Sequence, residues 1–407
     1  MRQITILKSE PDLILTLPLS LIPLGIIILI RPLFLIRVGF LHNDRLGHFG
    51  GNTEMFVLEK KEASQKPGYK KSLDLFYLPR NVSCNKTMER MWSRILIMVP
   101  RVFARPLCLI IRSFKSLSVH RCGATANEDR DIHNLMDKYP PSLSFSRQEE
   151  EIGKENLVMM GIPNGAAFVC LNVRDSAYLS QAGNGDYNYH NYRDSDIQNY
   201  VLASEELADR GYFVIRMGVH VHEAMKSTHP RVIDYATKGM RSDFMDIYLG
   251  AKCEFCISVG SGFDAVPLIF QRPTVYVNMV PMGYLCTFIK QSLAITKHYY
   301  SLEKNIELTL NEIFDTGIGF SPYSADYQTK KIQLIENTPE EIRDVVVEMA
   351  GRMNRSWQSH EEDEALQKRF WEIFPTLAVN SSGARIHGEI RMRFGSQFLR
   401  NNQKWLQ

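Results

Sequence analysis

The sequence predicts an α/β protein of two domains, each with a parallel sheet flanked by helices, preceded by a hydrophobic segment. The chain has 407 residues, too many for one ordinary core and suited to two α/β domains. Its fractions of hydrophobic and charged residues, 44% and 23%, are those of a folded globular protein. Short apolar runs alternate with helical patterns along most of the chain, and this alternation is typical of parallel sheets.

The N-terminal residues 1–32 are predicted to associate with a membrane. Residues 13–30 carry no charged side chain and have Lys8 before them and Arg31 and Arg37 after them. As a helix this run would extend about 27 Å, close to the thickness of the hydrocarbon layer of a bilayer. The segment either spans the membrane or lies in its surface. The alternative is a buried core helix.

The first domain is predicted to cover residues 33–155. Residues 33–41 are apolar and bounded like a buried strand, and residues 73–78 form a second strand candidate. Helices are expected to begin near Asn52 and Lys86. These elements favour a Rossmann-like arrangement of alternating strands and helices.

Residues 91–115 combine apolar and basic side chains. Such a mixture suits a surface that lies against anionic lipid headgroups. A pair of core helices with solvated charges is the alternative. The cations are Arg94, Arg101, Arg105, Arg112 and Lys115.

The second domain is predicted to cover residues 156–355, after a polar linker that ends near residue 155. Ser242 is the expected N-cap of a helix, and Thr338 with Glu341 forms a capping box for another. Strands that alternate with such helices indicate a doubly wound parallel sheet. The strands are expected at residues 168–173, 212–217, 255–259 and 274–278.

Residues 356–407 are predicted to form helices that pack back on the first domain. Apolar side chains recur at four-residue spacing among basic residues near the end of the chain, which is typical of an amphipathic helix. The apolar positions are Ile386, Ile390, Phe394 and Phe398.

Candidate ligand-binding residues follow three strands of the second domain. Arg174 follows the first, Arg216 lies near the end of the second, and Gly260, Ser261 and Gly262 follow the third. Ligands of open parallel sheets bind beyond the carboxyl ends of the strands. Glycines allow a close approach of the backbone, a helix N-terminus attracts anions, and arginine grips phosphates with two N–H groups. The set predicts a diphosphate site; ordinary turns and surface ion pairs are the alternative.

Two stretches of the second domain carry a resemblance to a known fold family. Residues 241–278 resemble the donor half of GT-B glycosyltransferases, and together with residues 168–179 they are similar to the fucosyltransferase superfamily. With residues 42–56 and 190–200 included, the chain resembles a bacterial family of glycosyltransferases. The resemblance extends over two regions of the chain, residues 33–60 and 165–355.

The resemblance implies two Rossmann-like domains that face each other across a cleft. It also implies that Arg174 binds the diphosphate of a nucleotide-sugar donor and that no metal or other cofactor is needed. The superfamily motif has a histidine where this chain has Asn172. A fucosyl donor is therefore not implied.

The first domain is expected to bind the acceptor. Asp44 and His48 follow its first strand, and an inverting transferase needs a general base to deprotonate the acceptor hydroxyl. Glu54 is a weaker candidate because it lies one helical turn further on. Arg45 is expected to bind an anionic acceptor or the donor phosphate. The alternative is a polar loop that caps the helix at Asn52.

Several classes of site are disfavoured. Lys and Arg number 48 against 45 Asp and Glu, so the charge balance gives no reason to expect nucleic-acid binding. Cys253 and Cys256 lack a second pair for zinc and are expected in the core. His220 and His222 lack a third ligand at a recognisable spacing, so no metal is predicted.

These observations together predict a metal-independent glycosyltransferase of hexosyl or deoxyhexosyl type. Its donor would be a nucleotide sugar, and its acceptor a lipid-linked or cell-envelope glycan. The expected location is the cytoplasmic face of the plasma membrane. Two alternatives stay open, a sugar-nucleotide epimerase or hydrolase and a non-catalytic protein of envelope polysaccharide assembly.

Overall fold

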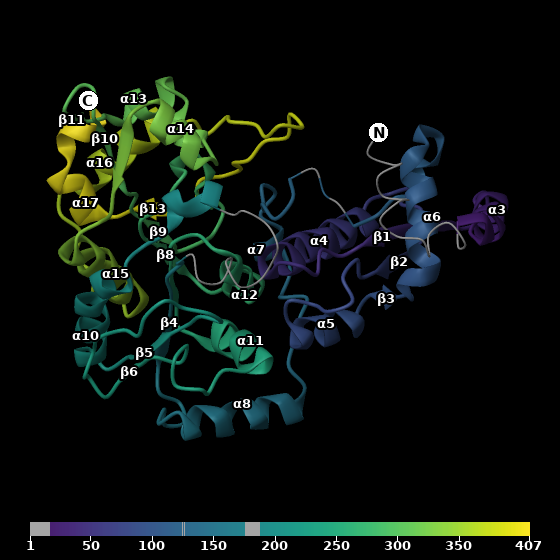
Figure 1. Ribbon diagram of the computed structural model, residues 1–407, viewed down its shortest axis with the longest axis horizontal. Helices are drawn as coiled ribbons and strands as arrows, with labels where there is room; N and C mark the ends of the chain where they lie inside the picture. Colours follow the sequence, from purple (N-terminus) through teal and green to yellow (C-terminus); the bar gives the residue numbers. More distant parts are fainter. Residues whose placement is uncertain (1–16, 124, 126, 176–187) are drawn as a thin grey trace. The chain divides into compact units, whose positions relative to one another are not determined.

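The computed structural model describes residues 17–123, 125, 127–175 and 188–407. The chain divides into two compact units (Figure 1): the first is Met1–Asp129 with Leu135–Ser144, and the second is Arg130–Asn134 with Phe145–Gln407. Part of the uncharged N-terminal run (residues 13–16) and part of the segment 168–179 lie outside the described residues.

The first unit contains a three-stranded parallel sheet in the order β1-β2-β3. Its strands are β1 (Leu35–Phe40), β2 (Ser72–Tyr77) and β3 (Ile97–Met98). Phe40 pairs with Tyr77, so β1 and β2 end together at one edge of the sheet. The prediction of parallel strands in this region is confirmed.

Helices surround this sheet, and α6 buries one face against it. Residues 91–115 do not form the pair of helices considered as the alternative: α5 ends at Ser93, and the short strand β3 precedes α6. The helices are α4 (Thr53–Ser64), α5 (Lys86–Ser93), α6 (Arg101–Ser113) and α7 (Leu135–Lys138). The buried cluster contains Ile27, Val38, Tyr77, Ala104, Leu107, Cys108 and Ile111.

The N-terminal hydrophobic run ends in a ten-residue helix, α3 (Leu21–Ile30). Ile27 is buried in the cluster of the first unit, whereas Leu29 is exposed. Among the described residues, no helix combines the length and the hydropathy that a bilayer crossing requires.

The second unit contains a seven-stranded parallel sheet in the order β13-β9-β8-β7-β4-β5-β6. The chain runs outward from β4 through β5 to β6, returns to β7 on the other side of β4, and continues to β8 and β9. This is the strand order of a Rossmann fold, and the order reverses between β4 and β7. The strands are β4 (Phe168–Asn172), β5 (Phe213–Arg216), β6 (Val232–Ile233), β7 (Cys256–Ser258), β8 (Thr274–Tyr276), β9 (Leu293–Ala294) and β13 (Arg393–Phe394).

Helices cover both faces of this sheet, with α10 and α15 on one side and α11 and α12 on the other (Figure 1). The predicted caps are confirmed: Ser242 caps α11, and Thr338 forms a capping box with Glu341 at α15. The helices are α8 (Arg147–Met159), α10 (Val201–Asp209), α11 (Asp243–Lys252), α12 (Ala265–Ile269), α15 (Pro339–Met353), α16 (Asp363–Ile373) and α17 (Ser396–Asn401).

A small antiparallel sheet completes the second unit, in the order β11-β10-β12. Its strands are β10 (His298–Ser301), β11 (Ile306–Glu307) and β12 (Ile332–Ile335). Two short helices, α13 (Leu310–Asp315) and α14 (Ser324–Thr329), lie in the same stretch of chain.

Two segments differ from the sequence prediction. The linker ends before residue 155, because Ser146 and Glu149 form a capping box that starts α8. The predicted amphipathic helix through residues 386–398 is wrong. Phe394 is buried in β13, which pairs with β9, and α17 starts only at Ser396. The apolar residues at four-residue spacing therefore do not share one helix face, because part of this segment is the extended strand β13. The packing of residues 356–407 on the first domain stays a prediction.

Burial of Glu54 in the first unit predicts a pH-dependent stability. The side chain is 1% exposed, and burial raises its pKa from 4.5 to about 7, although Oε1 accepts a hydrogen bond from the Ser142 amide. When folding raises the pKa of a carboxyl, its protonated form favours the folded state. This contribution to stability is complete below the pKa of the unfolded state and is lost as pH rises to about 7. The loss is about 3 kcal/mol at most.

Glu54→Gln should therefore flatten this pH dependence and stabilise the protein at pH 8, because glutamine keeps the acceptor for Ser142. Urea unfolding at pH 5 and pH 8 measures the effect. Glu62→Gln is the control, since Glu62 is a more exposed carboxylate paired with Lys138. If Glu54→Gln is less stable than the wild type at pH 8, the buried carboxyl is not a source of destabilisation.

Candidate functional site

The reversal of strand order in the second unit brings β4 and β7 side by side. Asn172 at the end of β4 pairs with Ser258 at the end of β7. The Asn172 Nδ2 donates a 2.6 Å hydrogen bond to Ser261 Oγ, which also accepts from the Phe263 amide at 3.2 Å. Because both bonds use the oxygen as an acceptor, the Ser261 hydroxyl keeps its hydrogen for donation to a ligand.

The loop after β7 requires a glycine at its second position, residue 260. Gly260 has a φ of +77°, and an added Cβ would lie 2.8 Å from the Met279 sulfur. The Asp264 carboxylate accepts from Ser258 Oγ at 2.5 Å and from the Ser261 amide at 2.8 Å. The Ser261 amide is therefore already occupied, which differs from the expected open helix N-terminus. Gly262 is exposed at the start of the helical turn.

Arg174 lies just beyond β4 and is mostly buried, with 11% of its side chain exposed. Its Nη1 donates to the His190 carbonyl at 2.9 Å and contacts the Asp194 carboxylate. Its Nη2 is buried and has no hydrogen-bond partner among the described residues. Burial lowers the pKa of Arg174 and raises that of Asp194. Arginine nevertheless stays protonated, so this guanidinium offers a charged donor for a phosphate oxygen.

The structure adds two cations that the sequence did not single out. The Arg193 guanidinium donates to the Gly260 carbonyl. Lys297, only 5% exposed, donates to the Asp194 carbonyl at 2.6 Å and lies 3.7 Å from Glu336 Oε1. Burial lowers the pKa of Lys297. Lys297 follows β9, so its position just beyond a strand end was the signal that could have identified it.

Arg216 is placed differently from its prediction as a diphosphate ligand. It is 1% exposed, and its Nη1 lies 3.2 Å from Asp234 Oδ1. Because Arg216 is still within β5, its side chain points to a face of the sheet and not beyond the edge. The structure thus gives this arginine an internal partner, and we do not include it in the donor site.

The first unit has a cavity of about 530 Å³ at the edge where β1 and β2 end. Phe40 and Tyr77, the last residues of the two strands, line it. One face of α6 lines it as well, because Arg101, Arg105 and Leu109 lie on successive turns. The cavity is therefore lined by aromatic side chains from the strand ends and by arginines from the helix.

Asp44 and Arg80 line the same cavity from two loops. Asn43 joins these loops: its Nδ2 donates to the Arg80 carbonyl and to Ser83 Oγ, both at 2.9 Å, and its Oδ1 accepts from the Arg80 amide at 3.0 Å. Arg101 Nη1 donates to Asn81 Oδ1 at 3.0 Å. The exposed carboxylate of Asp44 thus shares the lining of this cavity with three arginines.

His48 and Arg45 are exposed and do not line this cavity. His48 begins a π-helical turn, His48–Asn52, and its Nδ1 lies 3.4 Å from Asn52 Oδ1. Its ring centroid lies 5.7 Å from that of His42, whose pKa is lowered by burial and by the charge of His48. Asn52 makes no side-chain cap bond at α4, so the alternative interpretation of this loop as a helix cap is wrong in that respect.

The described part of the chain offers no metal site. No group of three or more His, Cys, Asp or Glu side chains suited to a metal occurs there. Cys253 and Cys256 are free thiols and are buried, as expected for core residues.

No protein-family model matches the chain, and no curated protein matches it. Among the solved structures that are similar to it, three each cover 60% of its length. A glycosyl transferase family 9 protein from Veillonella parvula has 11% identity and a TM-score of 0.38, with 80% of that chain covered. The E. coli ADP-heptose LPS heptosyltransferase II has 12% identity, a TM-score of 0.36 and 86% coverage. The iron-containing dodecameric glycosyltransferase TibC from enterotoxigenic E. coli has 12% identity, a TM-score of 0.30 and 61% coverage.

Proposed function

We propose that the protein is a glycosyltransferase that binds a nucleotide-sugar diphosphate at the edge of the second unit. One observation carries this proposal: Arg174 and the Gly260–Gly262 loop lie where the order of the parallel strands reverses. Nucleotides bind at such switch points in doubly wound sheets. A hexosyl or deoxyhexosyl group is the sugar that we propose for transfer.

The diphosphate would be bound by protein cations without a metal. Arg174, Arg193 and Lys297 carry three positive charges, against two on Asp194 and Glu336. Arg174 Nη2 and the Ser261 hydroxyl would donate to phosphate oxygens. As the sugar leaves, negative charge grows on the diphosphate, and donors fixed in advance stabilise it more than they stabilise the ground state.

The acceptor would bind in the cavity of the first unit, with Asp44 as the general base. Asp44 is the only carboxylate that lines this cavity in the described residues. Arg80, Arg101 and Arg105 would hold an anionic group of the acceptor, in keeping with arginine's preference for phosphates. Arg45 and His48 would then lie outside the reacting groups.

We propose a membrane surface as the place of action, with a lipid-linked acceptor at the cytoplasmic face. In the first unit, α6 exposes Val102 and Phe103 beside its arginines, and Val82 is exposed in the loop that carries Arg80. Apolar side chains among cations are typical of interfacial binding. The exposed apolar face of α3 adds to this surface.

Phe103→Asp should weaken sedimentation of the protein with vesicles that contain anionic lipid. Phe103 is 71% exposed on α6, so the change puts a charge where a ring would insert and leaves the core intact. Leu377→Asp is the matched control in the second unit, because Leu377 is 74% exposed. Equal loss of binding in both variants, or no loss in either, would contradict the assignment of α6 to the membrane.

The function is tested by incubating the full-length protein with a panel of nucleotide sugars, with and without phospholipid-linked glycan acceptors. Transfer that requires an acceptor supports the proposal. Release of free sugar without acceptor dependence would indicate a hydrolase, and a changed sugar still attached to its nucleotide would indicate an epimerase. If the protein binds none of the nucleotides, the assignment of the donor site is wrong.

A further inference from the structure

A second cationic cavity lies in the second unit, at the edge of the large sheet opposite to the edge of the candidate donor site. Its volume is about 480 Å³. Residues 290–292 line it just before β9, and Arg391 lines it just before β13. Arg352, in the last turn of α15, closes another side. Since the Gly260–Gly262 loop follows a strand and these residues precede strands, the two sites lie at different edges of the same parallel sheet.

The lining of this cavity is strongly basic. Its lining residues, within the described part of the chain, include five cations and no aspartate or glutamate. Two carboxylates outside the lining pair with its arginines: Arg352 pairs with Glu348 at 2.8 Å, and Arg393 pairs with Glu364 at 2.6 Å. The net charge at the lining is positive even when these pairs are counted. The cations are Lys290, Arg352, Arg355, Arg391 and Arg393.

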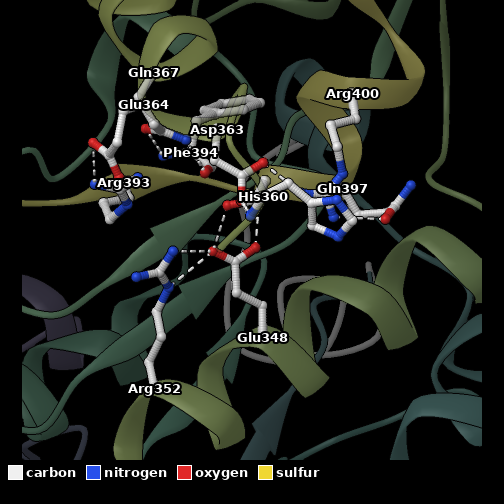
Figure 2. Close-up of polar contacts among 11 residues, drawn as sticks. Glu348, Arg352, His360, Asp363, Glu364, Gln367, Arg393, Phe394, Gln397 and Arg400 are labelled. Carbon is white, nitrogen blue, oxygen red and sulfur yellow. Dashed lines mark hydrogen bonds and ion pairs between the residues drawn. The ribbon is translucent and has the colours of Figure 1, made fainter. Parts of the chain in front are cut away.

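Polar contacts hold the two paired arginines in position (Figure 2), through a buried carboxylate at Arg352 and an exposed one at Arg393. Glu348 is fully buried and accepts from the Ser396 amide at 2.7 Å and from its hydroxyl at 2.8 Å, so its carboxylate is fixed toward Arg352. Figure 2 shows Arg393 reaching Glu364 from β13, next to Phe394, whose amide donates to Gln367 at 3.0 Å. Arginines fixed in advance lose little side-chain entropy when an anion binds.

Two buried donors on the lining have no hydrogen-bond partner among the described residues. They are Arg393 Nε and Trp357 Nε1. Buried N–H groups in native proteins almost always have a partner. The Arg352 guanidinium also lies 5.5 Å from the centre of the Trp357 ring. The lining therefore combines a charged donor, Arg393 Nε, with a neutral one, Trp357 Nε1, and both suit phosphate oxygens.

Two lining residues adopt a backbone conformation that non-glycine residues rarely take. Gln291 has a φ of 57° and Arg355 a φ of 63°. Each such residue costs conformational energy, and such residues concentrate at ligand sites. At both positions of the cavity lining, glycine would adopt the observed backbone conformation more easily than the residue that is present.

We propose that this cavity binds a compact oligophosphate anion, at a site separate from the one that would bind the sugar donor. Four of the five cations are arginines, one of them beside an indole, and guanidinium groups match phosphate oxygens better than they match a diffuse charge. The volume lies in the range of small-molecule sites, large enough for a triphosphate. The proposal does not depend on the activity of the protein.

The test is calorimetric titration of the full-length protein with sodium tripolyphosphate. Arg355→Gly removes one cation and places glycine at a left-handed position, so the variant should fold at least as well as the wild type. Affinity should fall about tenfold or more, as expected for loss of a charged hydrogen bond. Lys331→Gly is the matched control: Lys331 is exposed, has a φ of 53° and does not line the cavity. The affinity of the Lys331→Gly variant for tripolyphosphate should equal that of the wild type.

Three further titrations distinguish this cavity from the donor site and phosphate from other anions. Arg174→Ala should bind tripolyphosphate as the wild type does. If Arg174→Ala loses this binding and Arg355→Gly keeps it, the anion binds at the donor site and the proposal is overturned. Citrate should bind much more weakly than tripolyphosphate, and equal affinity would overturn the assignment to phosphate. Adenosine triphosphate should compete with tripolyphosphate. If adenosine triphosphate binds more tightly than tripolyphosphate, the ligand is a nucleotide; if the two bind with similar affinity, the ligand is inorganic oligophosphate. No heat of binding in the wild type overturns the proposal.

Discussion

Replacing Arg174 with alanine should abolish measurable sugar transfer while the protein stays folded. The guanidinium is mostly buried, and one of its nitrogens has no hydrogen-bond partner among the described residues. A phosphate at that nitrogen would be desolvated, and removal of its charged partner typically costs about 2–5 kcal/mol. Nucleotide affinity measured by calorimetry should fall accordingly, and circular dichroism should show an intact fold.

Arg174→Lys should restore little of this affinity. An ammonium group offers a point charge and cannot bond the His190 carbonyl, Asp194 and a phosphate in one plane. Arg210→Ala is the control, because Arg210 forms a surface ion pair with Glu206 within one helix, and such pairs contribute little. Unchanged nucleotide binding in Arg174→Ala would move the donor site elsewhere and remove the main support for the proposed function.

The parallel sheet of the second unit could be predicted because its signals are local. All five residues of β4 are buried, and the first four are apolar, so the strand shows no alternation. The caps at Ser242 and Thr338 use side chains within three residues of the helix start. The resemblance to glycosyltransferases then followed from the same stretch of chain.

The contents of the candidate donor site were harder to predict because they depend on long-range contacts. Arg193 reaches Gly260, and Lys297 reaches the backbone of Asp194. No spacing rule connects such residues. Arg216 shows the converse, since its place near a strand end suggested a ligand role, and only the structure shows Asp234 as its partner. A position at a strand end selects candidates but does not say whether the side chain points beyond the edge.

The first unit shows how a loop residue becomes a candidate base. Sequence reasoning named Asp44 and His48 together, since both follow the first strand. The structure separates them: Asp44 lines the cavity with Arg80, and His48 lies in a π-helical turn outside it. The buried Asn43 between the two loops accounts for the position of Asp44, and no local pattern in the sequence indicates that contact.

Replacing Asp44 with asparagine should lower kcat about 10²–10⁴-fold, the usual contribution of a general base. Asparagine has nearly the same shape and cannot take a proton, so acceptor binding through Arg80 and Arg101 should persist. His48→Gln should have a much smaller effect, because His48 does not line the cavity. Transfer rates at saturating donor and acceptor, with KM measured for both, separate lost chemistry from lost binding. If His48→Gln were as inactive as Asp44→Asn, or if Glu54→Gln were inactive and Asp44→Asn active, the base would not be Asp44.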